Sequence, residues 1–184
     1  MRVLVFGGSA SGKSQFAEDV TLSFSGPRVY LATMQPFGEE GLRCIERHRA
    51  LRAGKGFVTL ERSRGLASCD YAAALGESAA PDRSTVLLEC LGTLLANEMY
   101  DDDGVYEPGP GPADRVIAGA RALAQTFGNV VVVAVDAGCD VGDFSDQTLA
   151  YLRELGRIQA VLASEFDVVV EVAHGVPSVI KGAL

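Results

Sequence analysis

A glycine- and serine-rich stretch near the N-terminus has the residue types that bind phosphate. It fits the pattern G-x-x-x-x-G-K-[ST] in full with Gly7, Gly8, Ser9, Ala10, Ser11, Gly12, Lys13 and Ser14. In such a loop, backbone amides surround phosphate oxygens, the lysine reaches the outer phosphates and the last hydroxyl ligates magnesium. The pattern therefore predicts a site for Mg²⁺ with GTP or ATP, in which Lys13 is catalytic and Ser14 is a metal ligand.

A site of this kind needs a second acid for the magnesium shell, usually at the carboxyl end of a neighbouring buried strand. Glu89 ends the apolar run of residues 85–88, where burying a carboxylate would otherwise be costly. We expect Glu89 to be both a catalytic residue and a metal ligand. Asp136 follows the apolar run of residues 130–135 and stays an alternative. Glu61, at the end of residues 57–61, is placed with the nucleotide-binding residues.

The chain has only two histidines, His48 and His174, as nitrogen bases or nucleophiles at neutral pH. His48 lies on a helix predicted over residues 40–51, at the margin of its apolar stripe. That position alone fits a structural or solvated histidine as well as a catalytic one. His174 stands beside Gly175 and close to Pro177, which is typical of a loop.

Short valine-rich runs alternate with longer segments of helical spacing. Strands are predicted over residues 3–6, 29–32, 86–88, 130–135 and 168–172, with a further one at 57–61. Helices are predicted over residues 13–23, 40–51, 67–75, 93–99, 113–127 and 145–165. The alternation predicts an α/β fold with a mostly parallel sheet between two layers of helices, a three-layer α/β/α arrangement. Together with the phosphate loop, it predicts a RecA-like P-loop NTPase fold. We expect residues 1–184 to form a single domain. The proline- and glycine-rich residues 101–112 are a lid or a solvated connection.

Composition narrows the classes of partner. The 184 residues carry a net charge of −8, which disfavours nucleic acid and anionic membranes as partners but leaves small anionic ligands open. The four cysteines form no CxxC pair, so we expect reduced thiols and a cytoplasmic protein. The apolar runs are too short for a signal peptide or a membrane span.

Several segments together resemble the adenosylcobinamide kinase / adenosylcobinamide-phosphate guanylyltransferase family. They are the GGSASGKS loop, YLAT at residues 30–33, an acidic helix ending in His48-Arg49, LLECL at residues 87–91 with Asn97 following, and the C-terminal Gly175-Val176-Pro177 with Ile180-Lys181. The resemblance extends over essentially the whole chain. It implies an enzyme of cobalamin biosynthesis that phosphorylates adenosylcobinamide and then transfers GMP from GTP to that phosphate.

By resemblance, His48 is the nucleophile that carries the GMP, because a neutral imidazole nitrogen can displace pyrophosphate and leave a labile phosphoramidate. The resemblance also implies a homotrimer with adenosylcobinamide and GTP or ATP as its substrates. The chain departs from the family pattern at Cys44, at Gly92 and at Gln159-Ala160. Two alternatives stay open: a kinase that lacks guanylyl transfer, and a GTP-binding regulatory protein without turnover.

Overall fold

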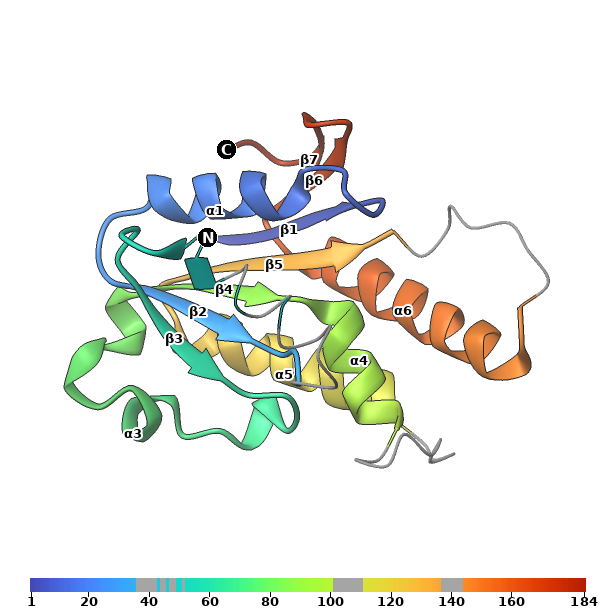
Figure 1. The fold of residues 1–184 in the computed structure, drawn as a ribbon, viewed down its shortest axis with the longest axis horizontal. Coiled ribbons are helices and arrows are strands. Elements are labelled where there is room, and N and C mark those ends of the chain that lie inside the picture. The colour runs from blue at the N-terminus through green and yellow to red at the C-terminus, as the bar shows by residue number, and fades with distance from the viewer. Residues whose placement is uncertain (36–42, 44–45, 47–48, 51, 101–110, 137–143) are drawn as a thin grey trace.

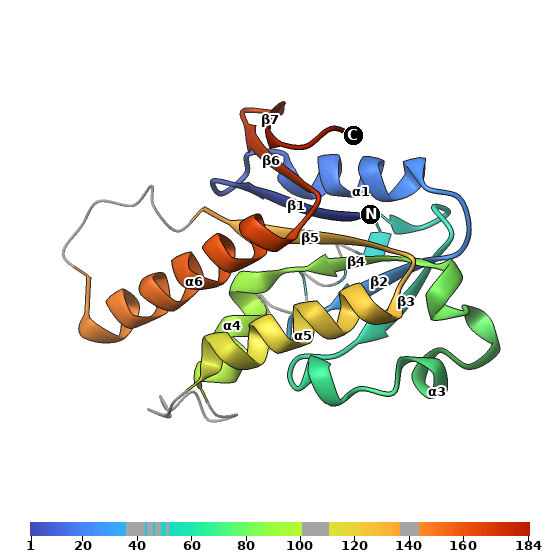
Figure 2. The same cartoon turned by 180° about the vertical axis from the view of Figure 1, so that it is seen from behind.

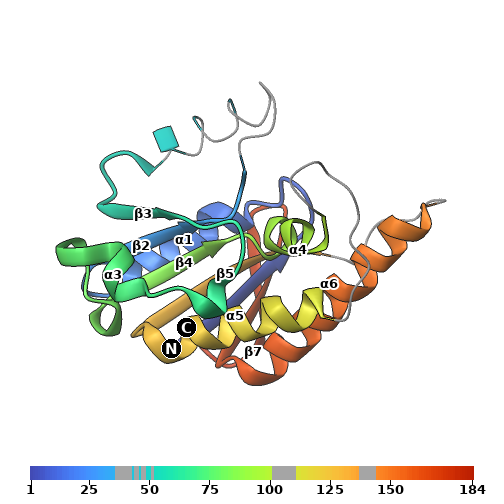
Figure 3. The ribbon, with the colours of Figure 1, turned by 90° about the horizontal axis from the view of Figure 1, so that it is seen from below.

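A computed structural model describes residues 1–35, 43, 46, 49–50, 52–100, 111–136 and 144–184. Its strands form one sheet in the order β3-β2-β4-β5-β1-β6-β7, in which only β7 is antiparallel to its neighbour. Figure 3 shows β3 and β7 at opposite edges of this sheet. The strands are β1 (Arg2–Gly7), β2 (Arg28–Ala32), β3 (Phe57–Glu61), β4 (Thr85–Glu89), β5 (Asn129–Val135), β6 (Val168–Ala173) and β7 (Val176–Lys181).

Helices cover both faces of the sheet (Figures 1 and 2). The helix α1 packs on β1, β4, β5 and β6, whereas α4 and α5 pack on β5 from the other side and contact α6. Valine and leucine side chains of the central strands are buried on both faces, in one apolar cluster under each helical layer. This is the predicted three-layer arrangement. The helices are α1 (Lys13–Ser23), α3 (Tyr71–Leu75), α4 (Leu91–Met99), α5 (Pro112–Thr126) and α6 (Asp146–Glu165), with short 3₁₀ turns at Leu66–Ser68, Gly76–Ser78 and Pro81–Arg83.

The structure differs from the predicted elements in two places. The helix predicted over residues 67–75 is divided, because Asp70 is extended and its carboxylate accepts the amide of Ala73 at 3.0 Å, which starts α3 as a separate helix. The strand β7 was not predicted, because it is exposed along its whole length and contains Pro177, so it has no alternating pattern.

Two other predicted segments lie partly outside the described residues. Of the helix predicted over residues 40–51, Arg43, Glu46, Arg49 and Ala50 are described, and all are helical. Of the predicted loop at residues 101–112, the first ten residues lie outside the described part, and Pro112 is the first residue of α5. In the described ranges, no helix is long and apolar enough to cross a lipid bilayer.

Candidate nucleotide site

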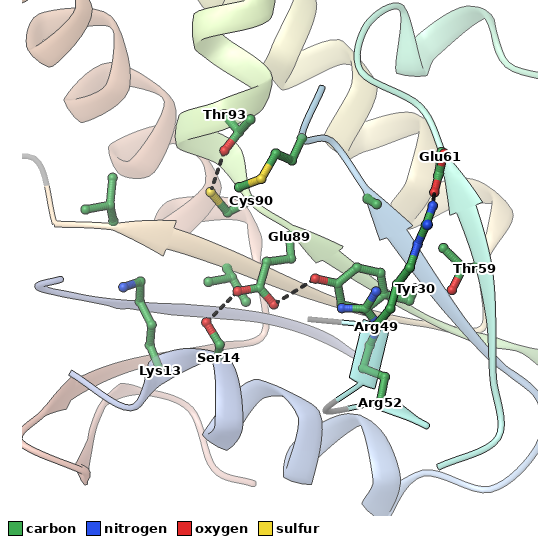
Figure 4. Close-up of a pocket in the computed structure, with 14 residues that line it drawn as sticks. Lys13, Ser14, Tyr30, Arg49, Arg52, Thr59, Glu61, Glu89, Cys90 and Thr93 are labelled. Atoms are coloured by element: carbon green, nitrogen blue, oxygen red, sulfur yellow. Dashed lines mark hydrogen bonds and ion pairs between the residues drawn. The ribbon is translucent and has the colours of Figure 1, made fainter. Parts of the chain in front are cut away.

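Polar side chains gather where the parallel strands end. Gly7 ends β1, Glu61 ends β3 and Glu89 ends β4, so these residues share the carboxyl edge of the sheet. Ligands of open α/β sheets bind at this edge. A pocket of about 260 Å³ opens there (Figure 4), lined by Lys13, Ser14, Tyr30, Ala32, Met34, Arg49, Arg52, Thr59, Glu61, Glu89, Cys90, Thr93, Val133 and Val135.

The phosphate loop has the expected strand-loop-helix context. It leaves β1 at Gly7 and enters α1 at Lys13, whose ammonium donates to the carbonyl of Gly8 at 2.9 Å. Gly12, immediately before the helix, has a φ of +91°, a conformation in which a Cβ would be strained. The positive end of α1 therefore faces the loop, as an anion site requires.

The structure brings Ser14 and Glu89 into direct contact. The Ser14 hydroxyl donates to Glu89 Oε1, and the Tyr30 hydroxyl donates to Glu89 Oε2 at 3.4 Å (Figure 4). The expectation that the acid follows a strand next to the loop strand was wrong, because β5 lies between β1 and β4. Glu89 reaches Ser14 across that intervening strand. Asp136 follows β5 and donates its backbone amide to the Gly7 carbonyl at 3.0 Å, but its side chain does not line the pocket.

A second strand end fixes the backbone around Glu89. The buried hydroxyl of Thr33, just after β2, donates to the Glu89 carbonyl at 3.0 Å. The same hydroxyl accepts the amide of Cys90 at 2.9 Å. These bonds hold the chain on both sides of the Glu89 side chain.

The donor set fits a hard divalent cation. Magnesium prefers oxygen ligands and usually takes one or two of them from the protein and the rest from phosphate and water. Ser14 and Glu89 supply a hydroxyl and a carboxylate that already touch. Among the described residues no group of three or more His, Cys, Asp or Glu side chains could hold a metal ion, and an ion shared with a nucleotide needs no such group.

A buried cation forms another wall of the pocket. The Arg52 guanidinium lies 3.4 Å from the centre of the Tyr30 ring and is 7% exposed, and its Nε and one terminal nitrogen have no hydrogen-bond partner among the described residues. Burial, and next the nearby Glu89 carboxylate, raises the pKa of Tyr30 far above its usual range, so its hydroxyl keeps the proton that it donates. An anionic ligand would offset the desolvation of Arg52.

The far side of the pocket from Lys13 carries an ion pair between Arg49 and Glu61 (Figure 4). Both side chains are more than half exposed, so the pair is open to exchange with a ligand. Glu61 is thus in the pocket with the phosphate loop, as placed from the sequence. Tyr30, Arg49 and Arg52 were given no role from the sequence, although Tyr30 belongs to the YLAT segment and Arg49 follows the predicted nucleophile.

The structure describes one of the two histidines. His48 lies outside the described residues. Its neighbours Arg49 and Arg52 line the pocket. His174 is exposed in the turn between β6 and β7 with a φ of +51°, which agrees with the predicted loop.

Comparison with known proteins identifies the family. The family described as cobinamide kinase / cobinamide phosphate guanyltransferase matches residues 3–180. The chain belongs to this family. It is therefore a transferase of cobalamin biosynthesis, as the resemblance implied.

Individual relatives match nearly the whole length of this chain. It is 30% identical over 182 residues to the bifunctional adenosylcobalamin biosynthesis protein CobP of Pseudomonas aeruginosa, covering 99% of this chain and 98% of the relative. It is also 30% identical over 191 residues to the corresponding CobU protein of Escherichia coli, covering 98% and 100%. A solved structure from Pyrococcus horikoshii OT3 shares the fold alone, with a TM-score of 0.56 at 8% identity, covering 100% of this chain and 87% of that one.

Proposed function

We propose that this chain phosphorylates the free hydroxyl of adenosylcobinamide with GTP or ATP, and then transfers GMP from GTP to that phosphate through His48. The observation that carries the proposal is the contact of Ser14 with Glu89 beside Lys13, in one pocket at the carboxyl edge of the sheet. Family membership supports both reactions.

In the kinase step, the substrate hydroxyl attacks the γ-phosphorus and releases its proton to water, the bond to the β-phosphate oxygen breaks and the nucleoside diphosphate leaves. Lys13 and the loop amides hold the phosphates and oppose the charge of the transferring group. Ser14 and Glu89 would hold Mg²⁺, which supplies further charge neutralisation when bound. Thr33 keeps the Glu89 backbone in place for this contact.

In the guanylyl step, a neutral nitrogen of His48 attacks the α-phosphorus of GTP, and the bond to the β-phosphate oxygen breaks to release pyrophosphate. The phosphate of the substrate then attacks the same phosphorus, the N–P bond breaks and the imidazole is regenerated. Arg49 and Arg52 support this assignment, because they bring the chain beside His48 to the pocket and can hold the polyphosphate.

Glu61 supports a preference for guanine. A carboxylate only accepts hydrogen bonds, and guanine presents two adjacent donors, N1–H and N2–H, where adenine presents an acceptor at N1. Glu61 lies across the pocket from Lys13, where the base of a nucleotide held by the loop would lie (Figure 4). We propose that it binds the base, with Arg49 turning to the phosphates.

We further propose that the chain is a single domain that works in the cytoplasm as a homotrimer. The apolar side chains exposed on β7, Val176, Val179 and Ile180, support assembly through this edge. The free thiols of Cys69 and Cys90 fit a reducing compartment. Light scattering on the purified protein tests the trimer, and a monomer at micromolar concentration contradicts it.

Incubation with α-labelled GTP and Mg²⁺ tests the two steps separately. We expect an acid-labile GMP adduct on the intact protein and cobinamide-dependent consumption of GTP. His48→Asn should lose the adduct and keep most kinase activity, whereas Lys13→Ala should lose kinase activity while staying folded. Cobinamide phosphorylation without an adduct identifies a kinase alone. GTP binding without either reaction identifies a binding protein.

A further inference from the structure

A second hollow of about 210 Å³ adjoins the nucleotide pocket. Met34 and Thr93 line both, so the two cavities meet at these side chains. The other described residues that line the second hollow are Gln35, Arg64, Ala96, Asn97 and Tyr100. The junction also adjoins Cys90, which follows Glu89 and whose sulfur lies 3.3 Å from the Thr93 hydroxyl (Figure 4).

One face of α4 forms the floor of this hollow. Ala96, Asn97 and Tyr100 come three, four and seven residues after Thr93, a spacing that places them on the same side of α4 and of the residue that follows it. Because α4 begins directly after the Glu89-Cys90 segment, this face leads outward from the carboxylate proposed to hold magnesium. A molecule lying along it would have one end at the site of phosphoryl transfer.

The polar groups of the hollow are suited to a ligand that donates hydrogen bonds. Asn97 donates through Nδ2 to the carbonyls of Thr33 at 2.7 Å and Ser63 at 3.1 Å, and Gln35 donates to the Ser63 hydroxyl at 3.1 Å. Their donor ends are thus turned to the protein, which leaves the amide oxygens of two lining residues as acceptors.

The positively charged side chain that lines the hollow, Arg64, already donates hydrogen bonds to the protein. The Arg64 guanidinium donates to the carbonyls of Asn97 and Tyr100, whereas Arg52 in the nucleotide pocket leaves two nitrogens without a partner among the described residues. The Met34 side chain is 38% exposed and adds an apolar surface at the junction. The pocket with Lys13, Arg49 and Arg52 therefore suits an anion, and the adjoining hollow suits a molecule with amide donors and apolar parts but no anionic group.

We propose that this second hollow binds the acceptor substrate, an amide-bearing alcohol without anionic groups, with its hydroxyl at the Met34–Thr93 junction and its amide groups along α4. The assignment rests on the proposed function, and cobinamide belongs to this chemical class because primary amides surround its macrocycle. The acceptor and the nucleotide then approach Glu89 from different sides, which allows in-line attack on the γ-phosphate.

Ala96→Phe tests the assignment by filling the hollow from the face of α4. We expect the KM for cobinamide in the kinase step to rise by about tenfold or more, the equivalent of about 1.4 kcal/mol of binding. Binding of cobinamide itself, measured by equilibrium dialysis and corrinoid absorbance, should weaken by the same factor. Affinity for a non-hydrolysable GTP analogue and formation of the GMP adduct should stay unchanged, because the base and phosphates bind on the other side of Met34.

Ala118→Phe is the matched control, because Ala118 is an exposed residue of α5 outside both cavities. Gln35→Ala gives a milder second test and should weaken cobinamide alone. If Ala96→Phe is folded, binds the GTP analogue normally and keeps the parent KM for cobinamide, the acceptor binds elsewhere and the assignment is wrong. If the parent protein neither binds nor phosphorylates cobinamide, the proposed function fails and the assignment falls with it.

Discussion

The backbone amide of Gly175 donates a 2.7 Å hydrogen bond to the carbonyl of Ser11. The turn between β6 and β7 thereby contacts the phosphate loop, although the two segments are far apart in the sequence (Figure 1). A Cβ placed on Gly12 would lie 3.2 Å from the Gly175 Cα. The C-terminal hairpin is therefore a support for the loop that holds the nucleotide.

Gly12→Ala should destabilise the protein and weaken nucleotide binding. It combines a φ of +91°, which costs a residue with a Cβ about 1–2 kcal/mol, with crowding against the hairpin turn. Gly8→Ala is the control in the same loop, because Gly8 has no positive φ and a Cβ there meets nothing within 4 Å. Urea unfolding of both variants measures the difference. Equal stability would show that the hairpin does not constrain the loop.

Glu89→Gln and Asp136→Asn compare the two acids near the loop. Loss of the Glu89 charge should lower kinase turnover by about a hundredfold and shift magnesium dependence to higher concentrations, because the carboxylate touches Ser14. Asp136→Asn should keep most activity, since Asp136 is not among the residues that line the pocket. Magnesium titrations of initial rates give the answer. The opposite order of effects would assign the metal to Asp136.

The phosphate loop and the sheet could be predicted because each has a signal within a short continuous stretch of sequence. Residues 7–14 fit a complete motif, and the buried strands are continuous apolar runs. Glu89 was predicted because it ends such a run, and the structure places Glu61 at the same edge because parallel strands end there. The family resemblance was confirmed over residues 3–180.

The rest of the site depends on contacts that have no local signal. In the sheet, β5 lies between β1 and β4. The order of strands in a sheet cannot be deduced from the spacing of apolar runs along the sequence. The stacking of Arg52 on Tyr30 joins residues from different elements. From the sequence alone, an arginine at the end of a helix is expected to be exposed to solvent. The contact of Gly175 with Ser11 depends on β7, an exposed edge strand without alternating hydrophobicity. The assignment of His48 stays a prediction, because it lies outside the described residues.

Buried tyrosines should limit stability at alkaline pH. Burial is the largest cause that raises the pKa values of Tyr30, Tyr71 and Tyr151 above the usual 10.0, and that of Tyr151 reaches about 12. Below pH 10 the phenols are protonated in both states and add no pH dependence. Above it the unfolded chain releases protons that the folded protein retains, so the free energy of unfolding falls.

Tyr71→Phe isolates one of these groups. The variant starts less stable, because the Tyr71 hydroxyl donates to the Leu66 carbonyl at 2.8 Å. It should nevertheless lose less stability than the parent between about pH 8 and about pH 11, since one raised pKa is removed. Urea midpoints across this range measure the two slopes, and identical slopes would contradict the argument.

Gly92 and Tyr151 occupy adjoining space at the start of α4. A Cβ on Gly92 would lie 2.8 Å from the Tyr151 hydroxyl oxygen and 3.2 Å from a methyl group of Val135. Gly92 is also one of the positions named above at which the chain departs from the pattern of the family that it resembles. We infer that the tyrosine of α6 fills the volume that the missing side chain leaves.

Gly92→Ala should destabilise the protein by about 1–3 kcal/mol, because overpacking against Tyr151 outweighs the gain in helix propensity. In a Tyr151→Phe background the hydroxyl is absent, so the same substitution should cost less, with a coupling of about 1 kcal/mol in the double-mutant cycle. Gly156→Ala in α6 is the control, because a Cβ there meets nothing within 4 Å and should stabilise by up to about 1 kcal/mol. Urea unfolding of the four proteins of the cycle and of Gly156→Ala measures these differences. A cost at Gly92 that is the same with and without the Tyr151 hydroxyl would place the crowding at Val135 instead.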